Sequence, residues 1–367
     1  MPLRVGIIGL PNVGKTVLFN AMTKSGAESA NYLFSTKEAN IGTVDVPDYR
    51  LYELAKIVTP QKVVPATVEF VDIAGLVRGS SQGEGLGNKF LGSIRNVDAL
   101  VHVVRCFEDD NVFHVDETVD PERDIETIRL ELILADLESI ERRSTRLTSM
   151  IKSGDKAAKQ ETELLSLLVE RLNEGLPANL AGLSDADIDL LKKNLSLLTL
   201  KPMIYVANIN ENTLTDPEAD SCYRAVASLA AQEGAAAIPI SIQLESELSS
   251  FSREERIQYL NDLGVQETGL DQLIQKAFDS LGLMTYFTAG PKEVKAWTIR
   301  KNTKAPRAAG VIHSDIERGF IRAEVVTYEQ FLACNGEKGA KEKGQFRLEG
   351  KEYIIQDGDI VNFRFNV

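Results

Sequence analysis

The stretch "GLPNVGKT", Gly9 to Thr16, restricts the fold more than any other part of the sequence. It matches the pattern G-x-x-x-x-G-K-[ST] and lies between an apolar run, "RVGIIGL", and a segment with helical spacing, "TVLFNAMTKSG". Glycines let the backbone wrap around phosphate oxygens, and the amides at a helix N-terminus supply donors and positive potential. A glycine-rich turn would also fit the bare pattern, but the flanking strand and helix favour a phosphate-binding loop.

The residues of this loop have expected places around a nucleotide. Lys15 is expected to act as a catalytic residue that reaches the β- and γ-phosphates, and the Thr16 hydroxyl is expected to ligate Mg²⁺. The loop residues predicted to bind the nucleotide are Asn12, Val13, Gly14, Lys15, Thr16 and Val17.

Two further segments predict the rest of the phosphate and metal site. Asp72 ends the apolar run in "FVDIAG" and is expected to hold Mg²⁺, while the Gly75 amide is expected to approach the γ-phosphate. Thr36, in "NYLFSTKEAN", is a second predicted metal ligand, although an ordinary loop threonine would look the same. The glycines that follow Asp72 favour a switch segment over a packed element.

The stretch "VANINE", Val206 to Glu211, bears on the base. Ras-type GTP-binding proteins usually have Asn-Lys-x-Asp here, and the Asp reads two donors of guanine. In this chain Ile209 replaces the Lys, and Glu211 is one methylene longer than Asp, so the preference for guanine is weakened. Asn208 can donate and accept, and so can pair with either purine. We expect Asn208, Ile209 and Glu211 to bind the base, with ATP preferred; the alternative is a loop that touches no base.

Alternating strands and helices predict an α/β fold with a mostly parallel sheet. The expected strands include "TVEFVD", "ALVHVVRCF", "KPMIYVAN" and "AIPISI". From residue 284 the chain becomes strand-rich and predicts a small α+β domain, with a turn at Asp357-Gly358 between two alternating runs.

A different pattern begins near Asp120, where an N-cap is followed by Pro121. Apolar residues then recur with coiled-coil spacing, and "KSGDK" predicts a turn into a return helix, so the sequence predicts an inserted antiparallel helical arm. The predicted seam residues are Leu130, Ile133, Leu137, Ile140, Leu147 and Ile151, with Leu165, Leu168 and Leu172 on the return helix.

Charge is unevenly distributed in a chain whose net charge is −13. Residues 284–367 carry 14 Lys/Arg against 11 Asp/Glu, so the acidic excess lies elsewhere. Six basic residues surround the predicted tip of the arm, a pattern that favours contact with phosphate, although a solvated face is the alternative. They are Arg142, Arg143, Arg146, Lys152, Lys156 and Lys159.

Three scattered cysteines predict neither disulfides nor a zinc site, and the apolar run in "MPLRVGIIGL" is too short for a bilayer. We expect a soluble cytoplasmic protein without a membrane partner.

The motifs "GLPNVGKT", "DIAGLVRGSSQGEGLGNKFL", "DALVHVVRCFED", "VDPERDIETI" and "IHSDIERGFIRAEVV" together resemble the YchF/Obg-like ATPase family over nearly the whole chain. The resemblance implies a Ras-like P-loop NTPase domain (residues 1–128 and 200–283), an inserted antiparallel coiled-coil arm (129–199) and a C-terminal TGS domain of β-grasp type (284–367). It also implies Mg²⁺-dependent hydrolysis of ATP and association with the ribosome, and we expect a monomer. The chain departs from the family pattern at Leu33, Ala39 and Ile242.

The position of the water-orienting Gln of Ras-type enzymes is Leu76, so another group is needed or hydrolysis is slow. Of the three histidines, His102 lies in an apolar strand and His313 in the C-terminal region. His114 follows the strand in a loop at the ligand edge of the sheet, and it is the predicted catalytic histidine. A solvated loop residue is the alternative. Two other functions stay open: an Obg-type GTPase with relaxed base specificity, and a nucleotide-stabilised ribosome-binding module with little turnover.

Overall fold

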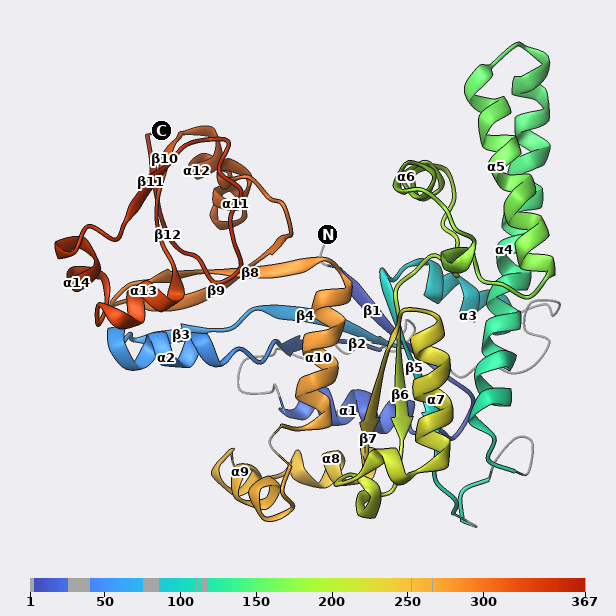
Figure 1. The fold of residues 1–367 in the computed structure, drawn as a ribbon, viewed down its shortest axis with the longest axis horizontal. Coiled ribbons are helices and arrows are strands. Elements are labelled where there is room, and N and C mark those ends of the chain that lie inside the picture. Colours follow the sequence, from blue (N-terminus) through green and yellow to red (C-terminus); the bar gives the residue numbers. More distant parts are fainter. Residues whose placement is uncertain are drawn as a thin grey trace. The chain divides into compact units, whose positions relative to one another are not determined.

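The structure is a computed structural model that describes residues 3–25, 40–74, 86–109, 111–113, 118–251, 253–265 and 267–366. Contacts within the chain divide it into two compact units (Figure 1). Unit 1 comprises Met1–Thr43 and Glu69–Leu273, and unit 2 comprises Val44–Val68 and Ile274–Val367.

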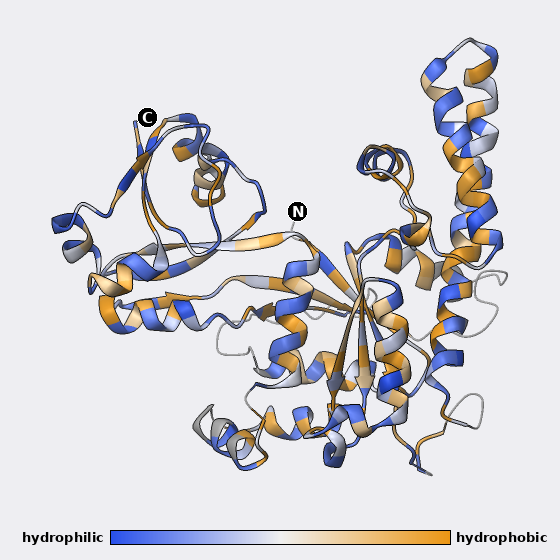
Figure 2. Cartoon of the chain, in the orientation of Figure 1, coloured by the Kyte–Doolittle hydropathy of each residue, from blue (hydrophilic) through white to orange (hydrophobic). Residues whose placement is uncertain are grey.

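Unit 1 is built on a sheet whose strand order is β2-β4-β1-β5-β6-β7. Neighbouring strands from β4 to β7 pair in parallel, and every residue of β5 is buried. Apolar residues are frequent in the central strands, as the orange segments of Figure 2 show. The carboxyl ends of these parallel strands therefore share one edge of the sheet, where ligands bind in open α/β folds. The strands are β1 (Arg4–Ile8), β2 (Asn40–Asp45), β4 (Thr67–Asp72), β5 (Ala99–Arg105), β6 (Met203–Asn208) and β7 (Ala236–Ile240).

The helices of unit 1 follow these strands. The predicted strand "AIPISI" ends earlier than expected, at Ile240, because the Ser241 hydroxyl accepts from the Leu244 amide and so caps the next helix. The helices of this unit are α1 (Lys15–Ser25), α3 (Leu86–Arg95), α7 (Ser221–Gln232), α8 (Ile242–Leu248) and α9 (Arg253–Asp262), with single turns η2 (Glu211–Thr213) and η3 (Pro217–Ala219). Helix α10 (Gly269–Ser280) begins in unit 1, and its residues from Ile274 on belong to unit 2.

Two long helices, α4 (Pro121–Lys152) and α5 (Lys156–Asn173), form a hairpin within unit 1. The predicted start is confirmed: the Asp120 carboxylate accepts from the Arg123 amide, and Pro121 occupies the first turn. The turn between the helices also lies where the sequence predicts it. The shared apolar cluster includes Ile133, Ile140, Leu147, Leu165, Leu168 and Leu172, with Leu137 partly buried against it.

The predicted seam is wrong at both ends, because Leu130 is 46% exposed and Ile151 is 36% exposed. Near its start α4 packs against β5 and α7, not α5, so a different face is buried there, with Ile128 and Leu132 on it. Ile151 lies in the last turn, where the chain reverses. The hairpin is followed by η1 (Ala178–Leu180) and α6 (Asp185–Asn194).

Unit 2 contains a mixed sheet with strand order β11-β10-β12-β8-β9-β3. Its main apolar cluster includes Tyr286, Phe320, Val325 and Phe363. The strands are β3 (Lys62–Val64), β8 (Leu283–Ala289), β9 (Glu293–Arg300), β10 (Phe320–Val326), β11 (Arg347–Glu349) and β12 (Ile360–Phe365). The helices are α2 (Tyr49–Val58), α11 (Ala305–Ile312), α12 (Ser314–Arg318), α13 (Tyr328–Ala333) and α14 (Glu337–Glu342).

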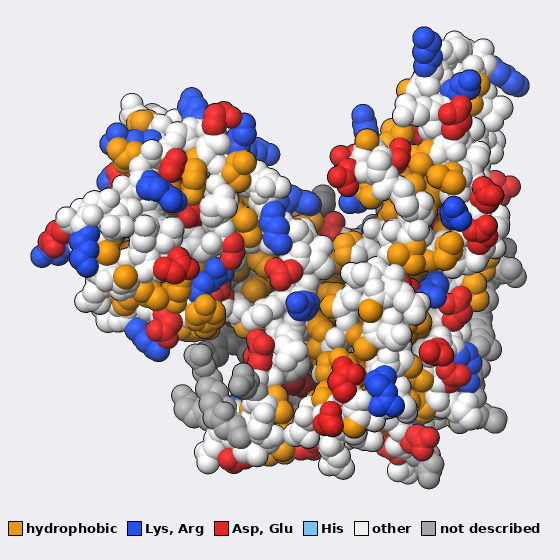
Figure 3. All heavy atoms as spheres, viewed as in Figure 1, with side chains coloured by type: hydrophobic (Ala, Val, Ile, Leu, Met, Phe, Trp, Pro, Cys, Tyr) orange, Lys and Arg blue, Asp and Glu red, His pale blue; other side chains and the backbone are white. Residues whose placement is uncertain are grey.

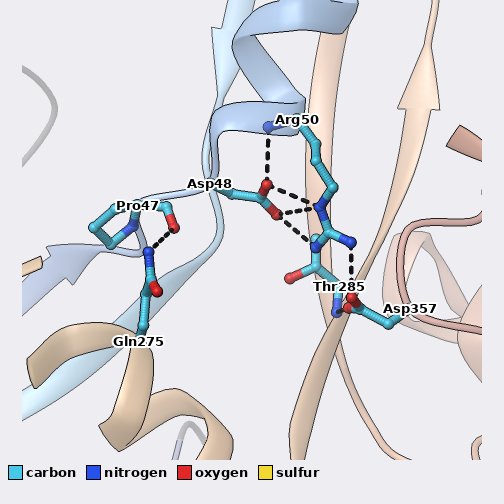
Figure 4. A network of polar contacts seen from close by, with 6 residues as sticks. All are labelled: Pro47, Asp48, Arg50, Gln275, Thr285 and Asp357. Carbon is cyan, nitrogen blue, oxygen red and sulfur yellow. Dashed lines mark hydrogen bonds and ion pairs between the residues drawn. The ribbon is translucent and has the colours of Figure 1, made fainter. Parts of the chain in front are cut away.

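The turn at Asp357-Gly358 is present, but the run before it is not the expected strand. Residue Ile354 forms only an isolated bridge with Lys304, whereas β12 pairs with β10 and β8. The reason lies in the turn itself: the Asp357 carboxylate accepts from the Thr285 amide at 3.0 Å and from Arg50 at 2.7 Å (Figure 4). The turn is therefore attached to β8 and α2, and no hairpin partner is needed.

Residues 44–68 belong by their contacts to unit 2, which differs from the predicted division of the chain. β3 pairs in parallel with β9, and the Arg50 guanidinium binds both Asp48 and Asp357 while lying 5.3 Å from the centre of the Phe287 ring. An early segment of the chain thus completes the sheet of its C-terminal part.

Candidate nucleotide-binding site

The loop between β1 and α1 has the backbone of a phosphate-binding loop. Gly9 has φ +150°, and a Cβ atom there would lie 2.5 Å from the Val103 carbonyl oxygen. Gly14 has φ +104°, and Asn12 has φ +63°, a conformation that asparagine tolerates better than most residues. The glycines are therefore required by close contacts as well as by backbone conformation.

Three of the predicted phosphate and metal residues, Lys15, Thr16 and Asp72, lie together at the carboxyl end of β1 and β4. The buried Lys15 ammonium donates to the Leu10 carbonyl at 2.6 Å, and the Thr16 hydroxyl donates to Asp72 Oδ2 at 3.0 Å. Burial lowers the pKa of Lys15 to about 8, against the attraction of Asp72. Burial raises the pKa of Asp72, while the Thr16 hydrogen bond and the Lys15 charge oppose that rise. A cation at this position would stabilise the ionised carboxylate.

The donor set fits Mg²⁺. A hydroxyl and a carboxylate in contact offer two hard oxygen ligands, and Mg²⁺ usually takes only one or two protein ligands beside water and phosphate. The described residues contain no group of three or more His, Cys, Asp or Glu side chains that could hold a metal ion.

A cavity of about 560 Å³ adjoins the phosphate-binding loop, within the size range of ligand pockets. Its lining combines predicted residues with several that the sequence did not single out. The predicted ones are Asn12, Gly14, Val17, Asn208, Ile209 and Glu211, and Ile242 was noted as a departure from the family pattern; the others are Phe107, Val112, Asn210, Asn212, Ser241, Gln243, Ser246 and Glu247.

Asn208 joins two walls of this cavity. Its side-chain amide donates to the Val13 carbonyl at 3.0 Å, and its side-chain oxygen accepts from the Ile242 amide at 3.2 Å. One N–H and one acceptor lone pair remain for a base. Asn208 thus fixes the phosphate-binding loop against the start of α8 in addition to facing the cavity.

Glu211 and Ile209 differ in exposure. Ile209 is buried in an apolar cluster with Val104 and Ala207, so it presents an apolar wall to the cavity, as expected. The exposed Glu211 carboxylate accepts from the Tyr259 hydroxyl of α9 at 2.9 Å. Tyr259 has no sequence signal that would connect it to Glu211 before the fold is known.

The loop after β5 forms another wall, and sequence reasoning missed it. Arg105 is buried at the end of β5, and its guanidinium donates to carbonyl oxygens of Phe107, Asp109 and Val112. A charged residue at the end of the otherwise apolar run "ALVHVVRCF" was the available signal, because a buried charge needs partners.

Three predicted residues, Thr36, Gly75 and His114, lie outside the described residues. Phe113, the described residue before His114, accepts from the Asn12 side chain at 3.2 Å. His102 is a buried strand residue, as predicted, and burial lowers its pKa to about 3. His313 lies in unit 2, where its Nδ1 accepts from the Asp315 amide.

None of the helices in the described ranges is long and apolar enough to cross a membrane.

Comparison with known proteins identifies the family. A model described as "50S ribosome-binding GTPase" matches residues 4–209, and the YchF GTPase C-terminal model, described as a protein of unknown function, matches residues 283–366. The protein named ribosome-binding ATPase YchF is 54% identical in Bacillus subtilis over 367 residues and 51% identical in Haemophilus influenzae over 368, and both alignments cover all of both chains.

Solved structures agree. The Schizosaccharomyces pombe YchF GTPase is 35% identical with a TM-score of 0.88, covering 99% of this chain and 97% of that one. A GTP binding protein from Pyrococcus horikoshii is 20% identical with a TM-score of 0.58, covering 99% and 100%, and shows the fold alone. The chain therefore has a Ras-like P-loop fold with mixed α/β sheets, and it belongs to the YchF family.

Proposed function

We propose that this protein is a Mg²⁺-dependent ATPase that hydrolyses ATP to ADP and phosphate and associates with the ribosome in a nucleotide-dependent way, as a regulatory switch in translation. The observation that carries the proposal is the hydrogen bond from Thr16 to Asp72 next to the buried, positively charged Lys15, beside a nucleotide-sized cavity. Relatives about half identical over their full length bear the name ribosome-binding ATPase.

Each residue has a role in this proposal. Lys15 neutralises the β- and γ-phosphates, and the Gly75 amide approaches the γ-phosphate. Thr16, Thr36 and Asp72 hold Mg²⁺, which when bound neutralises phosphate charge as it develops. His114 orients or deprotonates the attacking water. The Asn12–Phe113 hydrogen bond supports the last role, since it ties the residue before His114 to the phosphate-binding loop.

Lys15→Ala tests the site. Wild-type protein should release phosphate from ATP, and the variant should lose hydrolysis and much of its nucleotide affinity, because the charge at the phosphates is gone. Wild-type turnover in the variant would contradict the assignment.

His114→Ala tests the histidine. Single-turnover hydrolysis and ATP binding are both measured, and we expect the variant to retain its affinity for ATP while its rate of hydrolysis falls strongly. An unchanged rate would remove His114 from the mechanism.

ATP is the proposed substrate because Ile209 and Glu211 lack the guanine-reading pair, and Glu211 already accepts from Tyr259. The names of relatives differ on this point: the Bacillus protein is called an ATPase and the Schizosaccharomyces protein a GTPase. Isothermal titration should show ATP binding more tightly than GTP, and Glu211→Asp combined with Ile209→Lys should narrow that gap. GTP preferred by the unaltered protein would favour an Obg-type GTPase with relaxed specificity.

The ribosome is proposed to meet two surfaces: the α4–α5 hairpin, interpreted as the coiled-coil arm, and the C-terminal part of unit 2, interpreted as a TGS domain of β-grasp type. Lys and Arg side chains gather at the end of the hairpin in Figure 3. Arg143 is less available than predicted, because it is paired with the buried Glu161. The exposed basic residues that remain there are Arg142, Arg146, Lys152, Lys156 and Lys159.

Co-sedimentation with ribosomes in ATP, ADP and no nucleotide tests the partner. Deleting residues 140–160 should weaken co-sedimentation and its salt dependence while nucleotide binding persists. Unchanged co-sedimentation would leave the basic residues as a solvated surface. Turnover measured with and without ribosomes distinguishes an enzyme from a nucleotide-stabilised binding module. We also propose a monomer that works in the cytoplasm.

A further inference from the structure

The described part of the loop that follows β5, residues 106–109 and 111–113, is held by one buried arginine. Arg105 is only 3% exposed. Its Nε donates to the Phe107 carbonyl at 3.0 Å, and its two terminal nitrogens donate to the Val112 carbonyl at 2.8 Å and the Asp109 carbonyl at 3.1 Å. The guanidinium also lies 4.7 Å from the centre of the Phe107 ring. One side chain therefore fixes the described loop at three points and stacks on a fourth group.

This loop supplies one wall of the cavity beside the phosphate-binding loop. Phe107 and Val112, two of the residues that Arg105 holds, line that cavity together with Val17. The far end of the loop is attached separately, because the Asn12 side chain donates to the Phe113 carbonyl at 3.2 Å. The wall is thus anchored to β5 by Arg105 and to the phosphate-binding loop by Asn12.

We propose that Arg105 is a positioning residue for nucleotide binding, which holds Phe107 and Val112 against the face of the purine base. The inference rests on the proposed function and concerns the base, not the phosphates. A wall that is already ordered loses less conformational entropy when a base packs against it, so the guanidinium raises the base-dependent part of the affinity.

The geometry suits arginine specifically. The planar guanidinium carries five N–H donors in a fixed fork and can reach three carbonyls at once while it stacks on a ring. A lysine has a single nitrogen and cannot span the same acceptors, so Arg105→Lys should restore only part of the function.

The test separates the base from the phosphates. Isothermal titration of the full-length protein with ADP, GDP and inorganic pyrophosphate gives the ratio of purine-nucleotide affinity to pyrophosphate affinity. In Arg105→Gln this ratio should fall about tenfold or more, while pyrophosphate affinity stays within about twofold of wild type. Arg105→Lys should lie between the two proteins.

The matched control is Arg129→Gln. Arg129 is another poorly exposed arginine of unit 1. It pairs with Glu126 on α4 and with Glu233 at the end of α7, and none of these residues lines the cavity. Its substitution should lower thermal stability without changing the affinity ratio. This control distinguishes loss of the wall from a general loss of stability.

An unchanged ratio in Arg105→Gln, or an equal fall in Arg129→Gln, overturns the proposal. If Arg105→Gln does not fold, the same affinity ratio is measured in Arg105→Lys, where a fall supports the proposal and an unchanged ratio overturns it. Failure of the proposed function gives a different result. If the wild-type protein prefers GDP, the adenine preference is refuted, and the ratio of GDP affinity to pyrophosphate affinity then decides the role of Arg105. A wild-type protein that binds pyrophosphate but neither nucleotide refutes both.

Discussion

At the scale of single residues, Lys15 connects nucleotide affinity to pH. Burial lowers the pKa of its ammonium to about 8, and a bound phosphate would raise that pKa again. Binding therefore takes up a proton above pH 8, and nucleotide affinity should fall with rising pH by up to about tenfold per unit. Titrations between pH 7 and 9.5 check this. Lys15→Met should bind weakly with no such slope, and a flat profile for the wild-type protein would contradict the prediction.

Glu245 predicts a pH effect on stability. It is buried in α8, accepts from the Leu270 amide, and burial raises its pKa to about 7 from an ordinary 4.5. The folded chain thus holds this proton more tightly than the unfolded chain, so the free energy of unfolding falls as pH rises from about 4.5 to about 7.

Glu245→Gln keeps the carbonyl acceptor and removes the ionisation. The free energy of unfolding of the variant, relative to that of wild type, should rise by ~1–3 kcal/mol from pH 5 to pH 8. Urea unfolding at both pH values measures this difference. Glu247→Gln, an exposed change on the same helix, is the control and should show no comparable gain. A difference between Glu245→Gln and wild type that is independent of pH would refute the interpretation.

At the scale of elements, the α4–α5 hairpin shows which structural features the sequence predicts before the fold is known. Asp120 and Pro121 predict the start of α4 correctly, because capping depends on adjacent residues. The seam was wrong at Leu130, because periodicity does not say which neighbour a helix has at each turn. The same limit applies at the site: the phosphate-binding loop is local, whereas Arg105 and Tyr259 act on segments that only the fold brings near.

The pair of Arg143 on α4 and Glu161 on α5 predicts the stability of the hairpin. Arg143 donates twice to the Glu161 carboxylate, at 2.7 and 2.8 Å, and Asn194 donates to it at 3.0 Å. Arg143→Met leaves a buried carboxylate short of its cation, which should cost ~3 kcal/mol.

Hydrogen exchange should show faster opening of residues 140–165 in Arg143→Met, with nucleotide affinity unchanged. Arg142→Met is the control, since Arg142 and its partner Glu138 are both exposed and such pairs contribute little. Equal protection in the two variants would show that the buried pair is not what holds the helices together.

At the scale of the whole molecule, the order of segments was predictable and their grouping was not. The sequence places a nucleotide-binding region first and a strand-rich region last, as the structure does. Residues 44–68 carry no signal that assigns them to the C-terminal region, because β3 has only three residues and its partner β9 lies more than two hundred residues away. Pairing over such a distance is decided by tertiary packing.

Leu54 of α2 tests whether residues 44–68 belong with the C-terminal part of the chain. Its side chain is fully buried, and Leu54→Ala should destabilise unit 2 by ~2–5 kcal/mol through the cavity that it leaves. The only tryptophan of the chain, Trp297, lies on β9 and reports on unit 2. The midpoint of urea unfolding, followed by Trp297 fluorescence, should fall in Leu54→Ala, while ADP affinity in native buffer stays close to wild type.

The control is Leu18→Ala, an equally buried change on α1 beside the phosphate-binding loop. It should weaken ADP binding and move the Trp297 midpoint less. A Trp297 transition that responds to Leu18→Ala and not to Leu54→Ala would place residues 44–68 with the nucleotide-binding region after all.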